Sequence, residues 1–257
     1  MDVTGMKIYR LPAFLLCLLS CSESGGDMSM SAEEYGEMGM PDYSVNWSYD
    51  DYEDVCVILN NLKSAEPLSL PRKDSDKSSV VFNRMINPEN LSFLLSDTLS
   101  LQTKAFMIQK YVDIQGCLVT AYTENNTEKQ YYHRELIDLY IFGLTIAQDM
   151  LDLGQMINES VREEDIEMQY AYRSIQELYV VMVKSVLKNQ QRSQLFLKKD
   201  LERLSDFVYN SVLINSEWMG NAAAEEIIRE AENVIQNTSS GVIREKYDAL
   251  IDLLQSV

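Results

Sequence analysis

Few residues in this chain have the types and spacing that chemistry requires. His133 is the single histidine among 257 residues, which excludes di-iron sites built from two Glu-x-x-His motifs and zinc sites of the His-Glu-x-x-His type. Carboxylates cluster at 163–165 and 225–226, and Asp149 lies near Asp152. Two carboxylates that face each other can hydrolyse a glycosidic bond, but clusters on helices are usually solvated faces. We therefore predict no catalytic residue and expect a protein that is not an enzyme.

Two methionine pairs in the N-terminal part are candidate metal ligands. They are Met28-Ser29-Met30 and Met38-Gly39-Met40, and thioether sulfur is a soft ligand that suits Cu(I). The stretch around them contains no histidine, and the chain has 13 methionines, so that two such pairs can arise by chance. We expect neither a metal site nor a cofactor.

The cysteines do not form a metal-binding pattern either. After Cys21 only Cys56 and Cys117 remain, 61 positions apart, and no Cys-x-x-Cys motif occurs. Two cysteines are too few for a disulfide framework. We expect buried free thiols, and a single bridge in an oxidising periplasm is the alternative.

The first 21 residues have the layout of an export signal. A basic start from Lys7 to Arg10 is followed by an apolar run that ends at Cys21. At about ten residues, this run is shorter than the roughly 20 that a membrane-spanning helix needs. Whether translation begins at Met1 or at Met6 stays open.

The end of this run, Leu18-Leu19-Ser20-Cys21, resembles the lipobox of bacterial lipoproteins. Leucine three residues before the cysteine and serine directly before it match the pattern, whereas Leu19 replaces the usual small residue. The resemblance implies that residues 1–21 are a lipoprotein signal peptide with lipidated Cys21, and Ser22 after it favours the outer membrane. Several acyl chains make such an anchor effectively permanent. The alternative is an ordinary cleaved signal with a coincidental cysteine.

Residues 22–79 have the composition of a tether. From Ser22 to Leu62 there are ten acidic residues and no Lys or Arg, with several Gly and one Pro among them. Such a composition cannot bury enough apolar surface to offset the entropy of folding. We predict an acidic disordered tether over 22–79.

Aromatic residues alternate with acids inside this predicted tether. Trp47 is flanked by Tyr43, Tyr49 and Tyr52, between Asp42 and Asp54. Segments with this alternation dock partners by folding on contact, and aromatic side chains are frequent hot spots. We predict that Trp47, Tyr43, Tyr49 and Tyr52 bind a basic protein partner. The alternative is a plain tether in which these residues contribute only length.

The remaining residues, 80–257, show helical periodicity. The clearest apolar stripe has the 4-3-4-3 spacing of one helix face, and it consists of Leu136, Tyr140, Gly143, Ala147, Met150, Gly154 and Ile157. Its two glycines predict close approach of neighbouring helices. The run 178–183 is apolar on all sides, which predicts a central, buried helix. We predict an all-α, up-and-down bundle of four long helices, with one or two short helices near 222–235 and 243–254.

Charge and motifs together limit the function. With 40 acidic and 22 basic residues, the net charge of -18 repels phosphate backbones, so we expect no nucleic-acid partner. We predict a membrane-anchored, non-catalytic interaction or scaffold lipoprotein, an accessory subunit of an envelope assembly such as a secretion system. The alternatives are an immunity or inhibitor protein that binds a basic partner, and a periplasmic protein that handles metal or carbohydrate.

Overall fold

The structure is a computed structural model that describes residues 29–62, 69–126, 131–160 and 166–256. Within these ranges the chain is helical and contains no strand, which confirms the all-α prediction. The α-helices are α1 (Ala32–Glu37), α2 (Tyr49–Leu62), α3 (Ser79–Met85), α4 (Leu101–Asn125), α5 (His133–Ser160), α6 (Ile166–Gln190), α7 (Lys198–Asn215), α8 (Asn221–Asn237) and α9 (Gly241–Gln255). Short 3-10 helices span Pro88–Leu95, Ser193–Leu195 and Ser216–Trp218.

The four long predicted helices are α4 to α7, and the two shorter ones are α8 and α9. Periodic apolar residues are the reason they form, since the stripe predicted for 136–157 is the buried face of α5. Serine side chains cap two of these six helices. Ser100 Oγ accepts the N–H of Thr103 at the start of α4 (3.1 Å), and Ser240 Oγ accepts that of Ile243 in α9 (3.4 Å).

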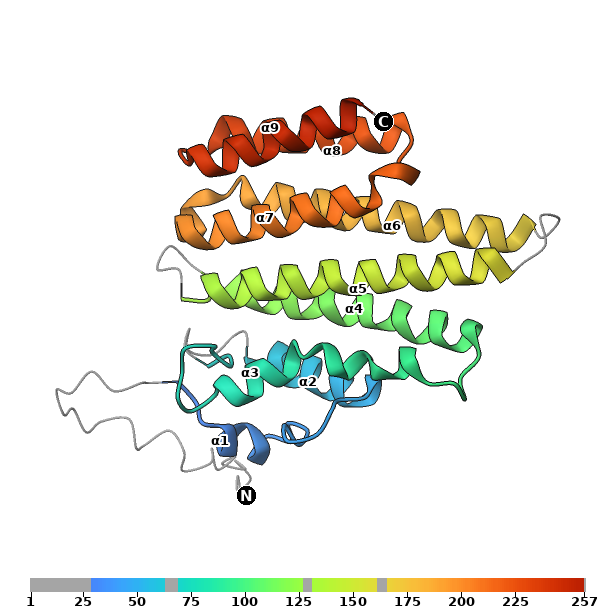
Figure 1. Cartoon of the computed structure of the whole chain (residues 1–257). Coiled ribbons are helices and arrows are strands. Elements are labelled where there is room, and N and C mark those ends of the chain that lie inside the picture. The colour runs from blue at the N-terminus through green and yellow to red at the C-terminus, as the bar shows by residue number, and fades with distance from the viewer. Residues whose placement is uncertain (1–28, 63–68, 127–130, 161–165, 257) are drawn as a thin grey trace, which may run out of the picture.

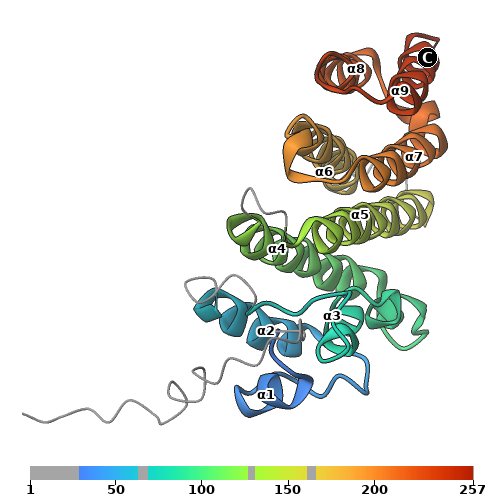
Figure 2. The same cartoon turned by 90° about the vertical axis from the view of Figure 1, so that its left-hand side faces the viewer.

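The helices are stacked in layers, and from α4 onward each layer is a pair of consecutive helices (Figure 1). Seen from the side, α4, α6 and α8 follow one another along one face, and α5, α7 and α9 along the other (Figure 2). The central helix is α5, which packs against α4, α6 and α7. The layer that consists of α1, α2 and α3, which we call the N-terminal layer, lies at one end of the stack, and α8 and α9 lie at the other (Figure 1).

Much of the predicted tether is a folded layer of this stack, so its predicted extent over 22–79 is wrong. Residues 29–62 and 69–79 form α1, α2 and the segment that enters α3. The acids of α2 lie on one side of the helix, whereas the other side is buried and consists of Tyr52, Val55, Ile58, Leu59 and Leu62. Each such side chain contributes about 1.5–3 kcal/mol when buried. Residues 1–28, including Cys21, lie outside the described residues.

Tyrosine hydroxyls hold the non-helical segment 69–78 against the helices. The hydroxyl of Tyr35 donates to Ser69 O and that of Tyr122 to Pro71 O, both over 2.7 Å. The hydroxyl of Tyr132 accepts the N–H of Leu70 at 3.1 Å. Because these groups are buried, each hydrogen bond satisfies a backbone atom that water does not reach.

The glycine prediction is confirmed at both positions of the stripe. A Cβ atom on Gly143 would lie 2.5 Å from Nε2 of Gln115, on α4. One on Gly154 would lie 2.9 Å from the ring of Tyr172, on α6. Glycine therefore allows α5 to approach both neighbours closely.

Candidate functional site

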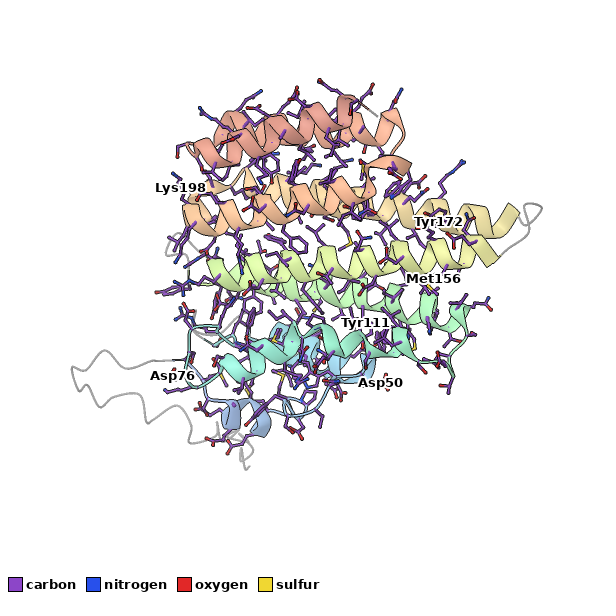
Figure 3. All side chains as sticks on the ribbon, viewed as in Figure 1. Asp50, Asp76, Tyr111, Met156, Tyr172 and Lys198 are labelled. Atoms are coloured by element: carbon purple, nitrogen blue, oxygen red, sulfur yellow. The ribbon has the colours of Figure 1, made fainter. Side chains whose placement is uncertain are left out.

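Two of the four predicted partner-binding residues belong to the core. Trp47 is 1% exposed and Tyr52 is fully buried, with their rings edge to face at 5.5 Å. Trp47 N–H donates to Asn90 Oδ1 at 2.9 Å. The Tyr111 hydroxyl donates to Trp47 O at 3.4 Å, from a side chain between α4 and the N-terminal layer (Figure 3). The prediction that a disordered tail presents Trp47 and Tyr52 to a partner is therefore wrong.

The other two predicted residues, Tyr43 and Tyr49, remain at the surface. Tyr43 is 36% exposed, and its carbonyl accepts a hydrogen bond from Arg84 Nε at 2.9 Å. The Lys110 ammonium lies 4.0 Å from the centre of the Tyr49 ring, a cation–π contact. Two cationic side chains of the protein itself, Arg84 and Lys110, therefore contact this aromatic, acidic segment. Binding of a partner by Tyr43 and Tyr49 stays a prediction.

The single histidine forms a side-chain contact with α7 at the start of α5. His133 Nδ1 lies 2.9 Å from Asp200 Oδ2 on α7. Nearby on α5, Asp138 forms ion pairs with Lys73 and with Arg203, and the Asp138 side chain is only 7% exposed. The two cations compensate the negative charge of the buried Asp138 carboxylate. These contacts join the segment 69–78 to α5, and α5 to α7.

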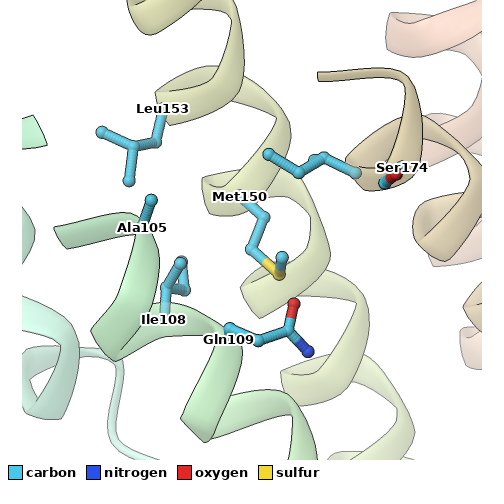
Figure 4. Close-up of a pocket in the computed structure, with 7 residues that line it drawn as sticks. Ala105, Ile108, Gln109, Met150, Leu153 and Ser174 are labelled. Carbon is cyan, nitrogen blue, oxygen red and sulfur yellow. The ribbon is translucent and has the colours of Figure 1, made fainter. Parts of the chain in front are cut away.

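Pockets occur on the face that α4, α6 and α8 share. The smaller is a cleft of about 260 Å³ between α4 and α6. Met150 and Leu153 of α5 form its floor, Ala105 and Ile108 of α4 line one wall, and Ser174 lies on the other (Figure 4). This cleft is apolar apart from its rim.

Beside Met150, α5 carries an aspartate with a shifted proton affinity. Burial, together with the charge of Asp152, raises the pKa of Asp149 to about 6. The folded state therefore holds this proton more tightly than the unfolded chain. The stabilisation that the protonated Asp149 side chain contributes is complete below about pH 4 and is lost as the pH rises through about 6.

Asp149→Asn should remove this pH dependence. Since Asp149 is partly exposed, we discount the shift and expect the variant to be more stable than wild type by about 1 kcal/mol at pH 8 and equally stable near pH 4. Urea denaturation across this range measures it, with the exposed Asp248→Asn as control. A parallel pair of stability curves for wild type and Asp149→Asn would contradict the assignment.

The larger cleft, about 780 Å³, lies between α6 and α8. Its apolar lining consists of Val180, Val181, Trp218, Ala222 and Ala223, and its charged rim of Arg173, Glu177, Lys184 and Glu226. We call it the α6–α8 cleft. Lys184 and Glu226 form an ion pair that joins the two helices.

The tryptophan of the α6–α8 cleft is fixed by contacts with two neighbouring side chains. Trp218 Nε1 donates to Asn215 Oδ1 at 3.1 Å, and its ring packs edge to face against Tyr179 at 5.8 Å. Val181 is 55% exposed. The α6–α8 cleft thus offers a fixed aromatic ring and an accessible aliphatic side chain, which suits an apolar group of a partner.

No protein-family model, curated protein or solved structure matches this chain. Function must therefore be inferred from the residues and their geometry. In the described part of the chain, no group of three or more His, Cys, Asp or Glu side chains could hold a metal ion. Of the methionine pairs, Met40 is buried and Met30 packs against the core, whereas Met38 is 42% exposed and Met28 lies outside the described residues. No described helix is long and apolar enough to cross a bilayer.

One sequence feature of the α6–α8 cleft is the apolar run 178–183, and the prediction made from it is wrong. The run 178–183 predicts a central helix that is buried on all sides, yet α5 is central and Val181 reaches the surface. An apolar side chain beyond what the core requires marks an interaction surface when it lines a cleft. Trp218 carries no such signal, because its position in the cleft depends on the α7–α8 connection.

Proposed function

We propose that this protein is a non-catalytic, membrane-anchored interaction protein and that it binds a protein partner in the α6–α8 cleft. The observation that carries the proposal is the composition of that cleft. Apolar side chains, among them Trp218 and Val181, line it together with charged side chains of both signs. Interface hot spots have this composition, in which an aromatic anchor is accompanied by polar residues that exclude water.

Charge favours a basic partner during approach. The rim of the α6–α8 cleft has two positive and two negative side chains, so the contact itself is electrically balanced. The whole chain carries -18, and a field of this sign attracts positively charged proteins and raises the association rate. Affinity then depends on the apolar lining, and orientation depends on the rim.

The anchor is lipid on Cys21, and the proposed location is the outer membrane. Ser29, the first described residue, follows Cys21 by only eight positions, which span at most about 28 Å. The layer with α1 must therefore stay close to the bilayer. Helix α8 lies at the other end of the stack (Figure 1), so that the α6–α8 cleft is on the part of the protein away from the membrane.

Cys21→Ala should abolish the anchor. We expect loss of the acyl chains from the intact mass and a shift from the membrane fraction to the soluble fraction or to unprocessed precursor. Cys17→Ala, inside the same apolar run, is the matched control and should leave both properties unchanged. Identical mass and fractionation of Cys21→Ala and wild type would contradict lipidation.

Val181→Lys should weaken binding in the α6–α8 cleft. A lysine there places a charge in the apolar lining, and we expect a loss of affinity of roughly tenfold or more for the partner that co-purifies with wild type. Val57, on α2, is 60% exposed, so Val57→Lys is a matched control and should not change the affinity. Equal affinities of both variants would contradict the proposed site.

A further inference from the structure

Two thiols from different layers of the fold contact each other where α2 packs on α4. Cys56 lies on α2 and Cys117 on α4, and the Cys56 side chain is hydrogen-bonded to that of Cys117. The structure contains no disulfide between these two residues, and both side chains are partly exposed, so the prediction of buried thiols is wrong. Two partly exposed thiols in contact have the arrangement from which a disulfide forms.

A second contact fixes the position of the Cys117 sulfur independently. Asn60 Nδ2 donates a hydrogen bond to Cys117 Sγ over 3.7 Å. Asn60 follows Cys56 by four residues on α2, and residues with this spacing share one helix face. The Cys117 sulfur therefore lies over the face of α2 that carries both side chains.

We propose that Cys56 and Cys117 form a disulfide bond in the exported protein and that this bond fastens the N-terminal layer to α4. The proposal rests on the proposed export, because disulfides persist in oxidising compartments. They are the only cysteines that follow Cys21, so no later cysteine of the chain competes with this pairing. The bond would close a loop across 61 positions, and long loops lose the most unfolded-state entropy when they are closed.

The oxidation requires a disulfide donor, which is a thiol–disulfide oxidoreductase in the cell or oxidised glutathione in vitro. The Cys117 thiolate attacks a sulfur of the donor, which forms a mixed disulfide and releases one donor thiolate. The Cys56 thiolate then attacks the Cys117 sulfur and releases the second donor thiolate. Two electrons pass to the donor, whose thiolates take up the two protons that the cysteines lost.

The order of attack follows from the hydrogen bonds. Cys117 Sγ accepts a hydrogen bond from Asn60. Contact with Cys117, and then burial, raise the pKa of Cys56 well above its usual value. A thiol with a raised pKa reacts slowly, so this pair is suited to a structural bond and not to a fast redox sensor.

The first experiment tests the geometry. The full-length protein, isolated in detergent and fully reduced, is treated with oxidised glutathione and digested without reduction. We expect one cross-linked peptide that contains Cys56 and Cys117, and a thermal midpoint about 5–15 °C above that of the reduced protein. Cys56→Ser and Cys117→Ser should show no such shift. Moving the thiol by one residue, in Cys56→Val with Val57→Cys, turns it away from α4 and should prevent the bridge.

The second experiment tests the compartment. Thiols are blocked with an alkylating agent in intact cells before the protein is isolated, and a bridge between Cys56 and Cys117 in this material supports the proposal. If the bridge forms with glutathione but is absent from the protein that was alkylated in cells, the proposed disulfide is overturned. The same result counts against export. If neither sample contains the bridge, or only bridges between molecules form, the inferred geometry is wrong and the proposed function is unaffected.

Discussion

Trp47→Ala is expected to lower the free energy of unfolding by about 3–5 kcal/mol, a large fraction of the stability of a typical domain. The side chain is 1% exposed and packs on Tyr52. Its removal leaves a cavity between the N-terminal layer and α4, and the hydrogen bond from Nε1 to Asp42 O is lost. Urea denaturation of wild type and variant measures the difference.

The control for Trp47→Ala is Tyr43→Ala, from the same acidic segment. Tyr43 is 36% exposed, and we expect its loss to change stability by no more than about 0.5 kcal/mol. If 22–79 were a disordered tether, neither substitution would affect stability. Equal denaturation midpoints for wild type and Trp47→Ala would therefore contradict the folded N-terminal layer.

Gly143→Leu is expected to destabilise the protein by about 3 kcal/mol. A Cβ at this position would lie 2.5 Å from Nε2 and 2.7 Å from Cδ of Gln115. Gln115 is itself buried, and its amide donates to Leu139 O over 3.1 Å. The leucine must displace this side chain, break the hydrogen bond and separate α4 from α5. The drop in thermal midpoint would be roughly 6–12 °C.

Gly116 is the matched control on the neighbouring helix. Nothing lies within 4 Å of a Cβ placed there, so Gly116→Ala should stabilise α4 by about 0.5–1 kcal/mol. A compensating change gives a sharper test, because Gln115→Ala removes the group with which the new side chain collides. The double variant Gln115→Ala, Gly143→Leu should be less destabilised than the sum of the two single variants. Additive effects would show that the contact is not the cause.

Local periodicity is the reason that α4 to α9 could be predicted. Their apolar residues recur at three and four positions, as in Ile243, Tyr247, Leu250 and Leu254 of α9, and all four are buried. The glycines of α5 were predictable for the same reason, since they interrupt a stripe in which a side chain would face a neighbouring helix. Neither prediction needed knowledge of distant parts of the chain.

The N-terminal layer could not be predicted in this way because its folding depends on a tertiary contact. Averaged over 22–62, acidic charge dominates and predicts disorder. The acids of α2 are confined to one side of the helix, and its apolar side covers α4. That surface of α4 is remote in sequence. What decided the outcome was the position of Tyr52 and Val55 within a helix turn, and not the composition of the segment.

The α6–α8 cleft was missed for a related reason. Val181 and Trp218 are 37 positions apart and meet only when α8 packs on α6. A sequence pattern shows that α6 has more apolar residues than one buried face requires. It does not show which of them the next layer leaves uncovered.

The most direct test of the proposed function is site-specific photocrosslinking in cells that make the protein. A photoreactive residue is placed at Val181, in the α6–α8 cleft, or at Val57, on the outer side of α2. We predict an adduct of one defined mass from position 181 and none from position 57. Mass spectrometry of that adduct identifies the partner, and a toxin or enzyme would favour the inhibitor alternative over a scaffold. No adduct from position 181, or equal adducts from both positions, would contradict partner binding in the cleft.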